Sequence, residues 1–130
     1  MIPTGTCEVT SGGALECKYI IHAVGPNMND PSQLGLDRGE LLAFAINNTL
    51  AAAEELGCRS ISIPAISTGS FGFPKAKCAE IMLKCVVNFC LENNETSNLK
   101  FIRMVNNDKE TVQAFVNEFD NNLLDNCQYL

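Results

Sequence analysis

The sequence predicts an α/β domain of three layers, with a mostly parallel central sheet of about four strands between layers of helices. Two observations lead to this prediction. Short apolar runs alternate with longer stretches of helical periodicity, which is the order of consecutive βαβ units. The chain has 130 residues, of which 46% are hydrophobic, enough for one core and short for two. We therefore expect a single domain over residues 1–130, ordered from about residue 4 to 124, with a frayed tail at 125–130.

The first part of the chain predicts a pair of strands. Residues 5–10 and 19–24 are separated by Ser11-Gly12-Gly13, which is a turn signal. The second of these strands is apolar along nearly its whole length, as expected for a strand covered on both faces. Two further short apolar runs, at 60–65 and 101–105, predict the remaining strands.

Three helices are predicted from apolar residues that recur at intervals of three and four. The first runs from about 36 to 56 and ends at Gly57, the second from 74 to 92, and the third from 109 to 124. Asp108 is expected to cap the third helix. We expect the apolar side chains of that helix to point inward, namely Val112, Phe115, Val116 and Phe119.

Composition and charge argue against several classes of function. The formal net charge is −6 and the isoelectric point about 4.6, so the chain lacks the basic surface that nucleic acids require. No apolar run reaches the roughly 18–20 residues of a membrane span. The N-terminal residues lack the basic and apolar regions of a signal peptide. We therefore expect an intracellular protein, cytoplasmic or nuclear, whose primary partner is neither nucleic acid nor a membrane.

The cysteines and the single histidine predict no metal site. Seven cysteines are an odd number and never form C-x-x-C, and the only histidine is His22. Buried free thiols are the interpretation that we favour, with Cys7 and Cys17 left open as nucleophiles. His22 lies in an apolar strand without an adjacent Ser, Cys or Asp, which favours a core or sheet-face position over catalysis.

The most informative segment is Ser62–Pro74, which reads Ser-Ile-Pro-Ala-Ile-Ser-Thr-Gly-Ser-Phe-Gly-Phe-Pro. A strand leads here into small residues, and Pro74 suits the first position of the next helix. Gly69 and Gly72 allow unusual backbone conformations and the close approach of a ligand. Backbone amides and a helix N-terminus gathered at one point attract phosphate. An ordinary strand-to-helix connection is the alternative, and the glycine spacing matches neither a P-loop nor a dinucleotide fingerprint.

The predicted topology favours phosphate binding over the simple connection. In open α/β sheets, ligands bind beyond the carboxyl ends of the strands. The loops that follow Val24, Ala65 and Val105 should therefore gather on one side of the sheet.

Two segments carry a resemblance to a known family. One is the strand Cys17–Pro26, and the other is the loop Ser62–Pro74. In their order, with a helix between them and Asn107-Asp108 after the last strand, they resemble a macro domain from Gly5 to about Phe119. The resemblance implies binding of ADP-ribose, free or attached to a protein, with ADP-ribose as a ligand and no cofactor.

The resemblance also implies which residues meet the ligand. The loop would wrap the diphosphate and the distal ribose, with the amides of Gly69, Ser70, Phe71 and Gly72 facing the phosphates. Phe71 or Phe73 would lie against the ribose, and the asparagines after the last strand would border the adenine. The full set implied for ligand binding is Val24, Gly25, Ala65, Ile66, Ser67, Thr68, Gly69, Ser70, Phe71, Gly72, Phe73, Asn106 and Asn107.

The sequence departs from the family pattern at its N-terminal end. The family's opening strand, its Asn-rich strand and its glycine-rich first phosphate loop have no counterpart in this sequence. Gly12-Gly13 is a hairpin turn between two strands and does not correspond to that loop. In hydrolytic members much of the catalytic apparatus lies in those segments, so the catalytic residues are unknown. Three functions stay open: binding of ADP-ribose, which we favour, hydrolysis of ADP-ribose from a protein or small molecule, and a degenerate domain kept for protein contacts.

The absent Asn-rich strand would lie between residues 19–24 and 60–65. Without it, two apolar strands would carry unpaired backbone groups, each costing about 1–3 kcal/mol when buried. We expect these two strands to close up and pair directly in a truncated, four-stranded sheet. The alternative is that another chain fills the gap, and an exposed sheet edge leaves a homo-oligomer open.

Overall fold

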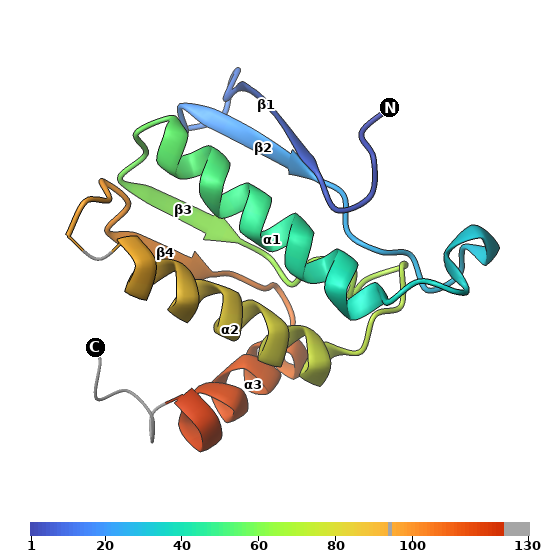
Figure 1. The fold of residues 1–130 in the computed structure, drawn as a ribbon. Coiled ribbons are helices and arrows are strands. Elements are labelled where there is room, and N and C mark those ends of the chain that lie inside the picture. The colour runs from blue at the N-terminus through green and yellow to red at the C-terminus, as the bar shows by residue number, and fades with distance from the viewer. Residues whose placement is uncertain (94, 124–130) are drawn as a thin grey trace.

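The computed structural model describes residues 1–93 and 95–123. These residues form four strands and three α-helices, in the order in which the sequence predicts them (Figure 1). The tail predicted at 125–130 lies outside the described residues. The strands are β1 (Cys7–Ser11), β2 (Tyr19–Ala23), β3 (Ser60–Ile63) and β4 (Phe101–Met104), and the helices are α1 (Arg38–Glu55), α2 (Lys75–Asn93) and α3 (Lys109–Glu118). A 3-10 turn, η1 (Pro31–Gln33), precedes α1, and a π-helical turn, η2 (Phe119–Leu123), continues α3.

Local chemistry fixes the ends of the helices. The Asp37 carboxylate accepts a hydrogen bond from the Glu40 amide at 3.1 Å and so caps α1. Gly57, with a φ of +71°, turns the chain out of that helix, as its position predicts. Asp108 caps α3 as predicted, because its carboxylate accepts from the Thr111 amide at 3.0 Å. No helix within the described residues is both long and apolar enough to cross a bilayer.

The core lies between the helices and the strands. Leu42, Ile46 and Leu50 of α1 are fully buried, and they share one apolar cluster with Cys78 and Met82 of α2. Burying a side chain of this size stabilises the fold by roughly 1.5–3 kcal/mol. These contacts hold α1 and α2 together and so fix the spacing of the strands that they cover.

The predicted inward face of α3 is mostly wrong. Of its four apolar residues only Phe115 is buried, while Val112, Val116 and Phe119 are 39–43% exposed. The helix packs on α2 through the side that carries Thr111 and Phe115. Apolar periodicity alone did not reveal which part of the stripe the neighbouring helix would cover.

The three-layer arrangement is not found in the described residues. In Figure 1, α1 and α2 lie on the same side of the strands, and α2 also packs against α3. On the other face of β3 and β4, Ser60, Ser62, Phe101 and Arg103 are exposed, and no described helix covers them. The described part of the chain is therefore a row of helices on one face of a strand layer.

The predicted direct pairing of β2 with β3 is also wrong. β1 pairs antiparallel with β2, β3 pairs parallel with β4, and these are two separate two-stranded sheets. Between β2 and β3 lies a cleft of about 790 Å³, which we call the inter-sheet cleft. α1 packs on β1 and β2 and also on α2, so a movement of β2 onto β3 would shift α1 against α2.

Candidate functional site

The predicted phosphate loop connects β3 to α2 at the carboxyl ends of β3 and β4. Its first residues are held by the segment that follows β4, because the Ala65 amide donates to the Asn106 side-chain oxygen at 2.9 Å. The Cys78 thiol, on the first turn of α2, donates to the Ile66 carbonyl at 3.5 Å. The base of the loop is thus fixed on both sides by side chains of neighbouring elements.

The loop itself is a tight turn closed by its own backbone. The Phe73 amide donates to the Ser67 carbonyl at 2.8 Å, and the Gly72 amide donates to the Gly69 carbonyl at 3.0 Å. Ser67 and Gly72 both have positive φ, +68° and +77°. A left-handed serine is uncommon and marks a backbone held in place by its surroundings.

Three consecutive amides of the turn remain available to a ligand. Within the described residues, the amides of Gly69, Ser70 and Phe71 have no hydrogen-bond acceptor, and all three residues are exposed. The fourth amide expected to face phosphate, that of Gly72, is already bonded to Gly69. A Cβ placed on Gly69 would meet no atom within 4 Å, so this position faces open space. The arrangement can bind an anion through backbone dipoles alone.

The segment that follows β2 reaches the same place through Gly25. A Cβ on Gly25 would lie 2.2 Å from the Ser67 hydroxyl oxygen and 2.5 Å from Ile66 Cγ2, so no larger residue fits without a shift. That hydroxyl is buried and has no hydrogen-bond partner among the described residues. Val24 lies just before this contact, with its amide and its carbonyl both bonded toward β1. The structure thus brings Gly25 beside Ile66 and Ser67.

The two asparagines and the two phenylalanines of the predicted site differ in how far they are buried. Asn106 is partly buried and turned toward the loop, whereas Asn107 is exposed. Phe73 is 5% exposed and belongs to the apolar core, while Phe71 is 38% exposed. Of the two aromatic rings expected beside a ribose, the geometry leaves only that of Phe71 on the surface.

A segment that the sequence did not single out supports the turn from outside. The Met28 amide donates to the Phe71 carbonyl at 2.8 Å, and the Asn29 side-chain amide donates to the Ser70 carbonyl at 3.0 Å. Arg38 donates in turn to the Met28 carbonyl at 3.4 Å. The only signal of this support in the sequence was the pair Asn27 and Asn29, residue types that favour turns. In the structure the Asn29 amide donates to the Asn27 side chain at 2.9 Å.

The cation nearest the end of the loop is neutralised by acidic partners. Lys75 Nζ lies 3.3 Å from an oxygen of Asp108 and 3.3 Å from an oxygen of Glu110. These contacts join the start of α2 to the start of α3. Lys75 is therefore already paired, and the groups that the turn could offer to an anion are backbone amides.

The other candidates for chemistry lie apart from this turn or are inert. His22 is exposed, and its Nε2 lies 2.9 Å from the Thr10 hydroxyl, consistent with a sheet-face histidine. Burial raises the pKa of the Cys78 thiol to about 12, and partial burial raises the pKa of Cys7. Neither thiol is activated as a nucleophile. In the described part of the chain, no group of three His, Cys, Asp or Glu side chains could hold a metal ion.

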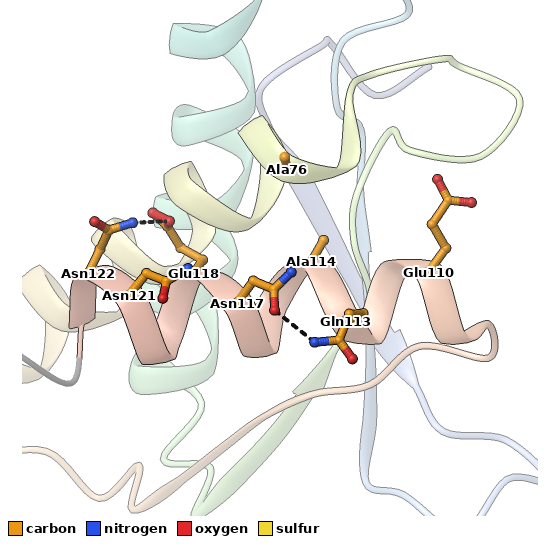
Figure 2. A pocket seen from close by; sticks show the side chains of 8 residues that line it. All are labelled: Ala76, Glu110, Gln113, Ala114, Asn117, Glu118, Asn121 and Asn122. Carbon is orange, nitrogen blue, oxygen red and sulfur yellow. Dashed lines mark hydrogen bonds between the residues drawn. The ribbon is translucent and has the colours of Figure 1, made fainter.

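A second hollow, of about 430 Å³, lies along α3. Figure 2 shows that it is lined mainly by amide and carboxylate side chains of α3 and η2, with Ala76 of α2 above them. Two hydrogen bonds run along the helix, from Gln113 to Asn117 and from Asn122 to Glu118, each 2.7 Å long. This hollow includes none of the predicted site residues.

Comparison with known proteins identifies the family of this chain. The family model "Macro domain" matches residues 1–82. An uncharacterised protein of Sulfurisphaera tokodaii is 42% identical over 122 residues, covering 94% of this chain and 62% of its own length. The solved Oceanobacillus iheyensis macrodomain with ADP is 31% identical, with a TM-score of 0.84, over 96% of this chain and 62% of that one.

A more distant structure has the same fold. The Trypanosoma brucei macrodomain in complex with ADP-ribose is 26% identical, with a TM-score of 0.76, over 87% of this chain and 44% of that one. The chain thus spans less than two thirds of each of these proteins. The family model and the fold lead to one conclusion: this chain belongs to the macro domain family.

Proposed function

We propose that the chain binds ADP-ribose, free or attached to a protein, through the turn Ser67–Phe73. The observation that carries the proposal is the run of three exposed amides at Gly69, Ser70 and Phe71, which have no acceptor in the part of the chain that the structure describes. Each hydrogen bond from such an amide to a phosphate oxygen contributes about 1.5–3 kcal/mol. Related macrodomains have been solved with ADP and with ADP-ribose, which supports a nucleotide diphosphate as the ligand.

Within this proposal, each part of the ligand has a place. The diphosphate lies on the three amides, Phe71 lies against the distal ribose, and Asn106 and Asn107 border the adenine. Binding is proposed ahead of hydrolysis because the groups gathered at the turn are amides, hydroxyls and aromatic carbons. The nearby Asp108 carboxylate is engaged by Thr111 and Lys75. A domain retained only for protein contacts would show no affinity for the nucleotide.

Calorimetric titration with ADP-ribose tests the proposal. The wild-type chain should bind, and Gly69→Glu should lose affinity about tenfold or more, because a carboxylate beside the free amides competes with the phosphates. Gly35→Glu is the matched control, since a Cβ at Gly35 also meets no atom within 4 Å and the charge change is identical. An equal loss in both variants, or no binding of ADP-ribose by the wild type at millimolar concentration, would overturn the proposal.

A further inference from the structure

The orientation of one peptide group decides whether the middle of the turn Ser67–Phe73 offers a donor or an acceptor to an anion. This group joins Ser70 to Phe71, so it carries the Ser70 carbonyl and the Phe71 amide. In a trans peptide the N–H and the C=O point in opposite directions. If the group turned over, the Ser70 carbonyl oxygen would take the direction that the Phe71 amide has now, and this oxygen would repel a phosphate.

The neighbouring peptide groups are held by backbone bonds. The Gly69 carbonyl accepts from the Gly72 amide at 3.0 Å, which fixes the peptide group that carries the Ser70 amide. The group that carries the Gly72 amide is held at both ends, because the Phe71 carbonyl accepts from the Met28 amide at 2.8 Å. Within the described residues, the group between Ser70 and Phe71 has no hydrogen bond to another backbone atom. Its orientation therefore depends on something other than the backbone.

The bond that holds this group comes from the side chain of Asn29. The Asn29 side-chain amide donates to the Ser70 carbonyl at 3.0 Å. The same nitrogen lies 3.9 Å from the point where a Cβ on Gly72 would stand, so it lies close against the turn. In Figure 1 the chain passes the loop before α2 on its way from β2 to α1. Asn29 thus approaches the turn from a segment about forty residues earlier in the sequence.

Asn29 is itself held in place by two further amide side chains. The Asn29 backbone amide donates to the Asn27 side-chain oxygen at 2.9 Å, and the Asn27 backbone amide donates to the Gln33 side-chain oxygen at 2.9 Å. Gln33 is 7% exposed, so this series of bonds begins in the interior of the protein. Because hydrogen bonds are directional, the series fixes where the Asn29 donor lies without any contribution from a ligand.

We propose that Asn29 is a positioning residue of the ADP-ribose site, which holds the Ser70 carbonyl away from the ligand and so directs the Phe71 amide toward the diphosphate. The inference rests on the proposed function of the turn. It also accounts for the charge of the ligand, because the run from Gly69 to Phe71 then presents donors, which suit an anion. Asn29 acts through the peptide group and not through contact with the nucleotide.

Calorimetric titration of Asn29→Ala with ADP-ribose tests this role. Without the donor, the peptide group between Ser70 and Phe71 can turn over, and the affinity should fall about threefold to tenfold. Asn48→Ala is the matched control, because the Asn48 side-chain amide also donates to a distant backbone carbonyl, that of Gly5, at 2.8 Å. Asn48→Ala should leave the affinity within about twofold of the wild type. Equal losses in the two variants would overturn the inference.

A measurement on the protein without nucleotide separates the orientation of the peptide group from general stability. In the wild type, NMR chemical shifts and coupling constants of Ser70 and Phe71 should report one orientation. In Asn29→Ala they should report a second orientation in exchange with the first, whereas Asn48→Ala should leave these signals unchanged. Wild-type signals in Asn29→Ala would show that the turn sets this orientation by itself, which would overturn the inference.

Further variants keep the inference testable if Asn29→Ala disturbs the segment around it. Asn29→Gln retains a side-chain N–H donor and should bind ADP-ribose more tightly than Asn29→Leu, which has none. Asn27→Ala removes the acceptor of the Asn29 backbone amide, so its loss of affinity and that of Asn29→Ala should be less than additive. Fully additive losses, or equal affinities of the Gln and Leu variants, would contradict a role through one peptide group.

The outcomes also distinguish this inference from the proposed function. No binding of ADP-ribose by the wild type would overturn both. Binding by the wild type together with equal binding by Asn29→Leu would overturn the positioning role alone and leave the proposed function standing.

Discussion

Gly25, two residues beyond β2, packs directly against the start of the phosphate turn. The space that a methyl group would need is occupied by the Ser67 hydroxyl and by Ile66. Because Ser67 is held in a left-handed conformation beside this contact, a shift of the turn would be transmitted to the amides that follow it. The absence of a side chain at residue 25 thus helps to set the shape of the turn Ser67–Phe73, although Gly25 contributes no side-chain atom to it.

Gly25→Ala should destabilise the fold and weaken ADP-ribose binding together. Overpacking of this kind costs about 1–3 kcal/mol, because Ser67 and Ile66 must move. Thermal unfolding and calorimetric titration of the same samples measure the two effects. Gly35→Ala, at a position where a Cβ meets nothing within 4 Å, should leave both unchanged or raise stability slightly. Wild-type stability and affinity in Gly25→Ala would show that the turn does not depend on this contact.

At the scale of elements, the N-terminal end of α3 contacts the first residue of α2, directly after the phosphate loop. The Asp108 carboxylate accepts from the Thr111 amide and hydroxyl, and Lys75 at the start of α2 lies 3.3 Å from it. Hydrogen bonds from Thr111, and then the contact with Lys75, lower the pKa of Asp108 from its ordinary value of 3.8. The folded chain therefore keeps this carboxylate charged at a lower pH than the unfolded chain does.

The consequence for stability has a defined sign. A lowered folded-state pKa contributes stability that is fully present above the unfolded value of 3.8 and is lost as the pH falls through the folded value. Asp108→Asn should lower the unfolding midpoint at neutral pH and reduce its acid dependence, measured by thermal unfolding from about pH 6 to pH 2. Glu16→Gln, the same change of charge at an exposed residue, should leave the acid dependence as in the wild type. Parallel curves for wild type and Asp108→Asn would refute this account.

At the scale of the whole molecule, a net charge of −6 opposes the binding of an anion. The proposed attraction comes from amide dipoles at short range, which salt screens little, whereas the repulsion acts at long range and is screened. The affinity for ADP-ribose should therefore stay constant or rise as sodium chloride is raised from about 50 to 300 mM. Titrations at several salt concentrations measure this. A steep fall in affinity with salt would indicate that cationic side chains, and not amides, hold the diphosphate.

The sequence sufficed to predict features that depend on neighbouring residues. The strands, the helix ends at Gly57 and Asp108, and the small-residue turn before Pro74 all follow from local chemistry. The gap between β2 and β3 belongs instead to the packing of elements far apart in the sequence, such as α1 on β2 and on α2, which local patterns do not encode. The support of the turn by Met28 and Asn29 was missed for the same reason, because it uses backbone carbonyls more than forty residues away.

The buried hydroxyl of Ser67 carries an energetic cost that a bound ligand could relieve. A buried hydroxyl that has no hydrogen-bond partner among the described residues, and a serine with positive φ, each raise the energy of this turn. A ligand oxygen that accepted a hydrogen bond from the Ser67 hydroxyl would remove that cost and also add a contact. Part of the binding free energy would then come from strain that the protein already holds without its ligand. Ser67→Gly should therefore raise the stability of the protein and lower its affinity for ADP-ribose.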